Sequence, residues 1–366
     1  MRICYLSNND MPSRMANSIQ TIKMCEAFAQ NGNDVLLICP NSEKIKNTIY
    51  KYYDVKTKFN FLKLKRYKKF PLGFYYYLFS LESILVSLKY KPDIYITRNF
   101  FTSFLLCLFR KKNILELHHP LEIESRVVRF LTKKLKFIKS KYLIRFIAIS
   151  NEAKKYYLQF LNLNDKRILT LPSGSSLKKK SNIFEPKQKK LKVGVFGSLH
   201  KWNLNLIIKL SKIDMKNQYY VYGDKRNSKL KLSNFKNNLY FREYVEYKNI
   251  DKELDKMDIL LMPYKKKIAS GGNVGDITNF TSPLKLFDYL TTGKIIITAD
   301  LPVLREILTK KNSIFIKNFN NPYAWKLEMN KIIKNLSKRK IFSINNLRLS
   351  EKYKLKKRAK ICLEGI

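Results

Sequence analysis

The chain has 366 residues, 45% of them hydrophobic, with 23 Phe and 23 Tyr, so it can bury the cores of two domains and general disorder is excluded. Its 73 basic and 28 acidic residues give a net charge of +45. The excess has three explanations: the compositional bias of a low-GC genome, attraction to an anionic membrane, and nucleic-acid binding, which ranks third because the lysines are dispersed.

Five cysteines stand at positions without paired spacing, and Cys4 and Cys39 lie in apolar runs, as small core residues do. The opening MRICYLS leads directly into a predicted strand, so no signal peptide is expected. No apolar run reaches the roughly 20 residues that a membrane-spanning helix needs. We therefore expect a cytoplasmic protein in a reducing compartment.

Strands and helices alternate along the chain. Apolar runs predict strands at 2–6, 35–39, 93–97, 113–117, 145–149 and 167–171, with a helix over 17–31. Residues 175–190 are polar and basic, as linkers are. A second set of strands is predicted at 191–196, 218–222, 259–262 and 294–298, and helices are predicted over 321–366.

This alternation predicts an α/β protein with two Rossmann-like, doubly wound domains that face a central cleft. An N-terminal domain is predicted at 1–178, a linker at 179–190, a second domain at 191–340, and a basic helical tail at 341–366. Ligands of such folds bind beyond the carboxyl ends of the strands, so the residues that follow each strand are the candidates for a site.

Polar residues follow the first predicted strand. Arg14, Asn17 and Ser18 can donate hydrogen bonds to phosphate or to sugar hydroxyls. The alternative is structural, with Asn17 as a helix cap and Arg14 as a surface residue. The chain has no G-x-G-x-x-G motif, which argues against a dehydrogenase.

Two adjacent histidines, His118 and His119, follow the predicted strand at 113–117 in a chain with three histidines. Metal binding is not expected, because adjacent residues project apart and no third ligand has suitable spacing. A structural histidine and a ligand-binding histidine both remain open.

Glycine stands at two further candidate positions. Gly197 directly follows the predicted strand at 191–196, where the lack of a Cβ lets the backbone approach a phosphate. Lys201 is a cation nearby, or else another exposed lysine. The run SGGNVGD at 270–276, which includes Gly272, is either mobile or close to a ligand.

The most informative segment is TSPLKLFDYLTTGK at 281–294. Ser282 is predicted to cap a helix, Pro283 to occupy its first position, and Gly293 to end it. The helix dipole disfavours Lys285 in the first turn, but a phosphate bound to the N–H groups of Leu284 and Lys285 reverses the sign. Asp288 can accept hydrogen bonds from a vicinal diol such as a ribose. Alternatively, Lys285 stands there by chance in a lysine-rich chain and Asp288 is merely solvated.

This segment resembles the signature S-P-x-K-L-F-E-Y-x-A-x-G-K of retaining glycosyltransferases of family 4, which have the GT-B fold. The pattern S-R-x-x-N-S-I-Q-x-x-K-M near the N-terminus resembles the opening of capsule and surface-polysaccharide glycosyltransferases. The resemblance extends from residue 2 to about residue 308. Two departures are Asp288, where the family usually has Glu, and Phe280, where many members have a second Glu that contacts the sugar.

The resemblance implies roles for the candidate residues. It places the donor pyrophosphate at the start of the helix with Lys285, the ribose on Asp288, and the transferred sugar beside His118 and beneath the loop that contains Gly272. Gly197 and Ser198 match positions that contact the pyrophosphate. Lys201 is a substitute for the family lysine at the position where this chain has Asn203.

The implied function is transfer of a sugar, with retention, from a nucleotide-diphosphate sugar to a glycan or lipid-linked acceptor in surface-polysaccharide biosynthesis. No metal and no cofactor are expected, because no acidic pair offers an Asp-x-Asp site. The alternatives are a GT-B sugar-nucleotide epimerase and a non-enzymatic basic protein that binds nucleic acid or an anionic membrane. For the enzyme no nucleic-acid partner is expected. Peripheral contact with the inner face of the cell membrane is suggested by the aromatic and basic run at 63–88, with Lys65, Arg66, Lys68 and Lys69.

Overall fold

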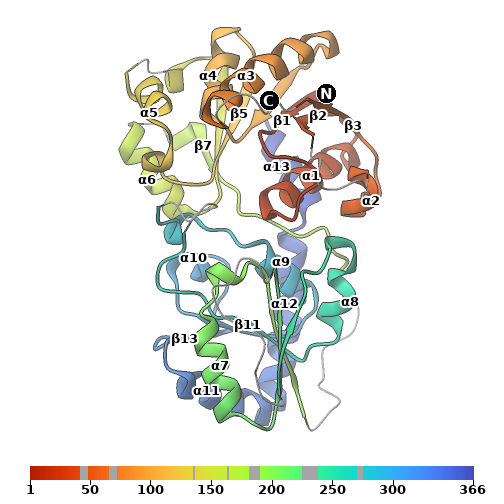
Figure 1. Ribbon diagram of the computed structural model, residues 1–366, viewed down its shortest axis with the longest axis vertical. Helices are drawn as coiled ribbons and strands as arrows, with labels where there is room; N and C mark the ends of the chain where they lie inside the picture. Colours follow the sequence, from red (N-terminus) through yellow and green to blue (C-terminus); the bar gives the residue numbers. More distant parts are fainter. Residues whose placement is uncertain are drawn as a thin grey trace. The chain divides into compact units, whose positions relative to one another are not determined.

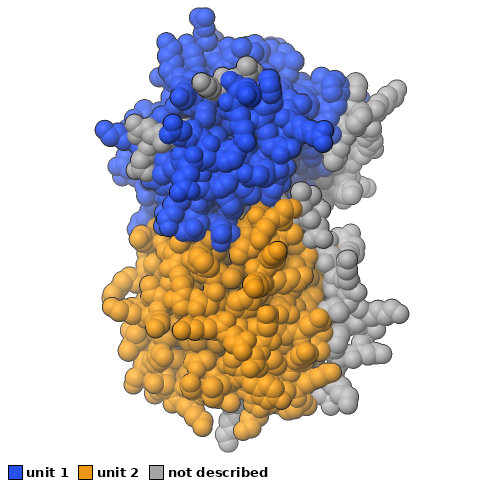
Figure 2. All heavy atoms as spheres, turned by 90° about the vertical axis from the view of Figure 1, so that its left-hand side faces the viewer, with its two compact units in different colours: residues 1–173, 279–282, 355–366 blue, residues 174–278, 283–354 orange. Residues whose placement is uncertain are grey.

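The computed structural model describes residues 1–41, 48–65, 72–134, 137–162, 165–180, 190–224, 238–269 and 275–366. The chain divides into two compact units, which Figure 2 distinguishes by colour. Unit 1 comprises Met1–Ser173, Asn279–Ser282 and Leu355–Ile366, and unit 2 comprises Gly174–Thr278 and Pro283–Lys354.

Unit 1 contains a parallel sheet in the order β3-β2-β1-β4-β5-β6-β7. Its central strands are buried on both faces and mostly apolar, as expected for a parallel sheet covered by helices. The strands are β1 (Arg2–Leu6), β2 (Asp34–Pro40), β3 (Asn60–Leu64), β4 (Ile94–Thr97), β5 (Asn113–Leu117), β6 (Leu143–Ala148) and β7 (Ile168–Thr170).

The α-helices of unit 1 are α1 (Ala16–Gln30), α2 (Ile49–Tyr53), α3 (Leu72–Ser87), α4 (Phe100–Leu108), α5 (Arg126–Lys133), α6 (Asn151–Leu161) and α13 (Leu355–Leu363). Helix α13 lies at the C-terminus of the chain and packs against α1, which lies near the N-terminus (Figure 1). The two ends of the chain thus belong to one compact unit.

Unit 2 contains a second parallel sheet, in the order β10-β9-β8-β11-β12-β13. Its strands are β8 (Lys192–Phe196), β9 (Gln218–Tyr222), β10 (Leu239–Arg242), β11 (Ile259–Met262), β12 (Ile295–Ala299) and β13 (Ile314–Ile316). Its α-helices are α7 (Leu204–Ile213), α8 (Ile250–Asp255), α9 (Leu284–Thr291), α10 (Pro302–Arg305), α11 (Pro322–Lys334) and α12 (Leu336–Lys352).

Both sheets follow the same connectivity, in which the chain builds outward in one direction and then returns to build on the other side of the first strand. This is the doubly wound order, so the predicted Rossmann-like architecture is confirmed in both units. The order reverses between β1 and β4 in unit 1 and between β8 and β11 in unit 2. Ligands of such sheets bind at the carboxyl ends of the strands at these two points.

Three strands were not predicted: β3, β10 and β13. The predicted strand at 145–149 begins two residues earlier, at Leu143. Most of the predicted linker at 179–190 lies outside the described residues, and the predicted domain boundaries remain a prediction.

All five cysteines are free and buried, and Cys4 and Cys39 occupy core strands as predicted. Within the described ranges, no helix is both long and apolar enough to cross a membrane.

Candidate functional site

Helix α9 begins differently from the prediction. Pro283 occupies the N-cap position in an extended conformation (φ −72°, ψ 121°), without a side-chain cap. Ser282, the predicted cap, instead accepts a hydrogen bond at Oγ from the Ser173 N–H, at 2.8 Å. The capping role of Ser282 is therefore wrong, because the extended proline delays the first helical residue to Leu284.

Because α9 has no side-chain cap, backbone N–H groups at its start are left without a capping acceptor. The Leu286 N–H bonds to the Pro283 carbonyl at 3.0 Å. The N–H groups of Leu284 and Lys285 have no acceptor among the described residues. Gly293, at φ +66°, directly follows the last turn of the helix, as predicted. An anion at the N-terminus of α9 would meet two unpaired N–H groups and the positive end of the helix dipole.

Lys285 and Asp288 are in contact on α9. Lys285 Nζ donates to Asp288 Oδ2 at 3.2 Å, and Ser175 Oγ donates to Asp288 Oδ1 at 2.7 Å. The Asp288 side chain is 1% exposed, so the alternative of a merely solvated aspartate is wrong. Each carboxylate oxygen already accepts one hydrogen bond, and a ribose would have to add to these bonds or replace one of them.

Three residues that the sequence analysis did not identify complete this cluster: Ser175, Ser176 and Tyr247. Ser176 Oγ lies 3.0 Å from the Tyr247 hydroxyl, and Lys285 Nζ lies 5.7 Å from the centre of the Tyr247 ring. Burial raises the pKa of Tyr247, so its hydroxyl stays protonated. The two serines stand at the start of the segment read as a linker, and the run Ser173-Gly174-Ser175-Ser176 was the available signal.

Gly197 makes the tight turn after β8. Its φ is +134°, and a Cβ there would lie 3.3 Å from the Trp202 indole. The preceding residue links the turn to α9, because the Phe196 N–H donates to the Tyr289 hydroxyl at 3.0 Å. Ser198 is exposed beside the turn.

Lys201 lies at the end of the short 3-10 helix Leu199–Lys201. Burial lowers the pKa of Lys201, and no carboxylate among the described residues counteracts this effect. Its carbonyl accepts a hydrogen bond from the Lys265 N–H at 3.2 Å, just beyond β11. Asn203 caps α7 by accepting from the Leu206 N–H at 3.1 Å. The predicted residue Gly272 lies outside the described residues.

The three predicted residues of the N-terminal loop differ in exposure. Arg14 is exposed, Asn17 is half-buried and Ser18 is buried. Asn17 Nδ2 donates to Asn9 Oδ1 at 2.8 Å, and Ser18 Oγ accepts from Ser13 Oγ at 2.7 Å. Helix α1 begins at Ala16 with Met15 at the cap position, so Asn17 is not the helix cap.

His118 follows β5 and borders a buried cluster of charges. Its Nε2 lies 3.4 Å from Glu116 Oε2, an oxygen that also accepts from Arg98 Nε at 2.9 Å. Burial and the charge of Arg98 lower the pKa of His118 to about 4, so the ring is neutral at pH 7. His119 points elsewhere, with Nε2 2.8 Å from Glu124 Oε1. In the described part of the chain, no group of three His, Cys, Asp or Glu side chains could hold a metal ion.

Phe280 packs as an apolar residue in unit 1. Its ring meets Tyr156 edge-to-face at 5.0 Å between centres, and Tyr157 at 6.5 Å. This position makes an aromatic contact and offers no hydrogen-bonding group to a sugar.

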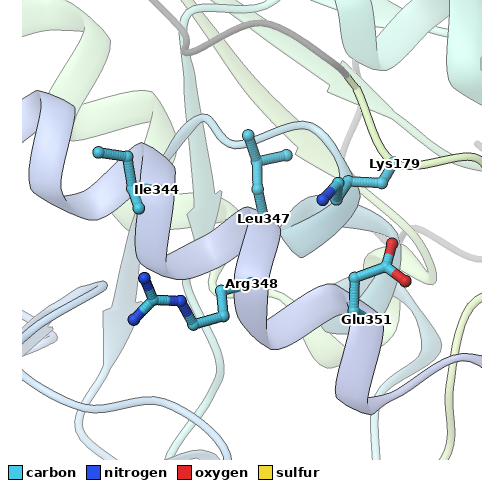
Figure 3. A pocket seen from close by; sticks show the side chains of 5 residues that line it. All are labelled: Lys179, Ile344, Leu347, Arg348 and Glu351. Atoms are coloured by element: carbon cyan, nitrogen blue, oxygen red, sulfur yellow. The ribbon is translucent and has the colours of Figure 1, made fainter.

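A surface hollow of about 340 Å³ lies along α12 in unit 2. Figure 3 shows the side chains that line it: Lys179, Ile344, Leu347, Arg348 and Glu351. None of them belongs to the predicted site or to the cluster around Asp288.

No protein-family model and no curated protein matches the chain in sequence. Solved structures match over nearly its whole length. HepE from Anabaena, solved with UDP-glucose, aligns with a TM-score of 0.69 at 13% identity, over 100% of this chain and 98% of its own. A glycosyltransferase from Rickettsia africae aligns with a TM-score of 0.67 at 16% identity, over 99% and 97%. WaaG, a glycosyltransferase involved in lipopolysaccharide biosynthesis, aligns with a TM-score of 0.61 at 12% identity, over the full length of both chains. At these identities the likeness shows the fold, and the chain has the predicted GT-B fold.

Proposed function

We propose that the chain is a glycosyltransferase that uses a nucleotide-diphosphate sugar. The observation that carries the proposal is the start of α9, where two N–H groups without an acceptor among the described residues stand beside Lys285 and a buried carboxylate. The leaving pyrophosphate gains negative charge during transfer. Fixed donors aimed at that charge stabilise the transition state more than the ground state.

The pairing of Lys285 with Asp288 suggests how the donor binds. When Lys285 turns toward a phosphate, Asp288 Oδ2 loses its present donor and becomes free to accept a ribose hydroxyl. Ser175, which bonds to the other oxygen, keeps the carboxylate in place meanwhile. Gly197, Ser198 and Lys201 are the other proposed pyrophosphate contacts, and Gly272 is proposed to lie over the sugar.

His118 is proposed to position the transferred sugar. Because its ring is neutral at pH 7, it offers a lone pair to a sugar hydroxyl and does not place a cation beside the reacting carbon. Arg14, Asn17 and Ser18 are proposed for the acceptor side. Retention at the anomeric carbon and independence of metal and cofactor are proposed from the family resemblance.

HepE was solved with UDP-glucose, and WaaG acts in lipopolysaccharide biosynthesis. These neighbours support a surface glycan or a lipid-linked sugar as the acceptor class. Because these neighbours include glycosyltransferases, which require an acceptor, they also favour a transferase over an epimerase, which requires none. A non-enzymatic basic protein would not require the paired Lys285 and Asp288.

The test is a thermal-shift screen against UDP, GDP and ADP and their sugars, followed by a turnover assay with a lipid-linked acceptor fraction. In the thermal-shift screen, a transferase is stabilised by one nucleoside diphosphate. In the turnover assay, it releases that nucleoside diphosphate from the donor sugar only when acceptor is present. An epimerised donor formed without acceptor would favour the epimerase. Salt-sensitive RNA binding with no stabilisation by any nucleotide would reject both enzymes.

We also propose that unit 1 contacts an anionic membrane from the cytoplasmic side. Val127 and Phe130 on α5 are 50% and 57% exposed, and Arg126 and Lys134 flank them. Of the four cations suggested by the sequence, Lys65 is exposed, while Arg66, Lys68 and Lys69 lie outside the described residues.

Co-sedimentation with phosphatidylserine vesicles tests this contact. The double variant V127D/F130D should lose binding, and Y323D/L327D, which adds the same two charges at exposed residues of unit 2, should keep it. Equal binding by all three proteins would remove α5 from the proposal.

A further inference from the structure

Helix α13 carries a charged residue in the middle of its buried face. The buried residues of this helix are Leu355, Arg358, Ala359 and Cys362, which recur at the spacing of one helical face. The Arg358 side chain is only 4% exposed. Burying a guanidinium costs several kcal/mol unless a partner offsets the loss of water. An apolar side chain would dock the helix without that cost.

The partner is Glu116 on β5, which is 242 residues earlier in the chain. Arg358 Nη2 donates to Glu116 Oε1 at 2.9 Å, and Arg358 Nε donates to the Pro172 carbonyl at 2.9 Å. Glu116 Oε2 accepts from Arg98 Nε and from the Tyr5 hydroxyl, each at 2.9 Å. One carboxylate, 1% exposed, therefore stands between two guanidinium groups.

This arrangement fixes the charge of Glu116. Burial alone would raise the pKa of Glu116, but the charges of Arg358 and Arg98 outweigh it and hold the pKa well below its usual range. An ionised carboxylate only accepts hydrogen bonds. The contact between His118 Nε2 and Glu116 Oε2 at 3.4 Å therefore requires the proton of the imidazole to be on Nε2.

The same cluster opposes a second proton on the ring. Burial of the ring is the largest cause, and Glu116, Arg98 and Arg358, which together carry one net positive charge, are the charged groups that add to it. Nδ1 therefore keeps its lone pair, and His118 can accept a hydrogen bond but cannot donate one from that nitrogen.

We propose that Arg358 is a positioning residue, which acts through Glu116 to hold His118 neutral, in the Nε2–H tautomer, with Nδ1 ready to accept a sugar hydroxyl. The inference deepens the proposed function, because it assumes that His118 meets the sugar. It gives α13 a role in the site beyond packing.

Nitrogen-15 NMR of the imidazole rings, recorded without any sugar or nucleotide, tests the proposal. The chain has three histidines, so H119Q and H200Q assign the spectrum. The wild-type protein should show His118 as the Nε2–H tautomer at pH 7. A cationic ring or an Nδ1–H tautomer there would overturn the proposal, whether or not any Arg358 variant folds.

Three variants separate the charge of Arg358 from the docking of α13. R358M should raise the pKa of His118 above its wild-type value of about 4 and mix the two tautomers. R358K, which keeps the charge, should preserve the wild-type spectrum. R145M is the matched control, because Arg145 donates to the carbonyls of Cys362 and Glu364 at the end of α13, each at 2.8 Å, without touching Glu116. An unchanged His118 in folded R358M, or an equal change in R145M, would contradict the proposal.

Kinetics distinguish this inference from the proposed function. R358M should lower kcat about tenfold, a usual effect of losing the outer partner of a functional ligand, while the affinity for the nucleoside diphosphate stays unchanged. If no nucleotide binds but the NMR result holds, the proposed function fails and the positioning by Arg358 stands. If nucleotide binds but R358M leaves His118 unchanged, only the positioning role is rejected.

Discussion

Lys285 stands in the first turn of α9, where the helix dipole disfavours a cation, and it pairs with Asp288 one turn further along. The ion pair offsets this cost in the absence of ligand. A diphosphate supplies a second offset, because the ammonium and the N–H groups of Leu284 and Lys285 then face an anion together. The charge of Lys285, which is unfavourable in the helix alone, therefore becomes favourable when a diphosphate binds.

The variant K285A should lose about 2–4 kcal/mol of transition-state stabilisation, because a fixed donor to the leaving group disappears. The effect should be measured as the fall in kcat/KM for release of the nucleoside diphosphate. K266A removes an exposed lysine of the same unit and should retain full activity. Wild-type turnover in K285A would rule out contact with the leaving group.

His118 predicts how stability depends on pH. Its pKa is about 4 in the folded protein and about 6.5 in an unfolded chain, so the unfolded state binds more protons between these values. The contribution of His118 to the free energy of unfolding is therefore fully present above pH 6.5. It is lost as the pH falls toward 4, and the loss is at most about 3 kcal/mol.

Urea unfolding of wild type and H118Q across this pH range measures the contribution. The variant should show a shallower loss of stability on acidification than the wild-type protein. Burial also lowers the pKa of His200, which adds a smaller effect of the same sign, so H200Q is the control. Parallel curves for wild type and H118Q would contradict a buried neutral His118.

Among the secondary-structure elements, the sequence predicted best those that are buried on both faces. The strands predicted at 113–117 and 259–262 coincide with β5 and β11, in which every residue is buried. The missed strands β3, β10 and β13 all stand at the edges of their sheets. β3 is half-exposed and has Asn60 and Lys63 among its apolar residues, so it shows no continuous apolar run.

The site could be predicted in part. Strand ends and the α9 motif indicated His118, Gly197, Lys285 and Asp288, because doubly wound folds expose these positions. Two further residues could not be found in this way: Ser175, which bonds to Asp288, and Arg358, which acts on His118 through Glu116. They are distant in sequence, and periodicity carries no information about which buried polar groups pair across a fold.

Gly293 at the end of α9 predicts a packing defect. The residue adopts φ +66°, and a Cβ there would lie 2.8 Å from Ser343 Oγ and 3.0 Å from Leu347 Cγ on α12. G293A should therefore cost about 1–3 kcal/mol in thermal stability. G32A also places alanine at positive φ (+81°), but without any neighbour within 4 Å, so it measures backbone strain alone. Equal losses in the two variants would show that the contact with α12 contributes nothing.

Considered as a whole, the chain forms two compact units that are not continuous in sequence. Residues 355–366 follow the whole of unit 2 in the chain, yet they complete unit 1. Unit 1 therefore lacks α13, and Glu116 lacks Arg358, until the last residues have been added. A fault in α13 should damage the half of the protein that is most distant from it in sequence.

A359D tests this expectation in the full-length protein. Ala359 is fully buried on α13, so an aspartate there brings an unpaired charge into unit 1 and should cost several kcal/mol. Hydrogen exchange followed by mass spectrometry should show lost protection in β1 and β5, while β8 and β11 keep theirs as an internal reference. K360D adds the same charge at the next, exposed residue and should leave both units protected. Equal loss of protection in the two sheets would mean that the units unfold as one, and that α13 does not belong energetically to unit 1 alone.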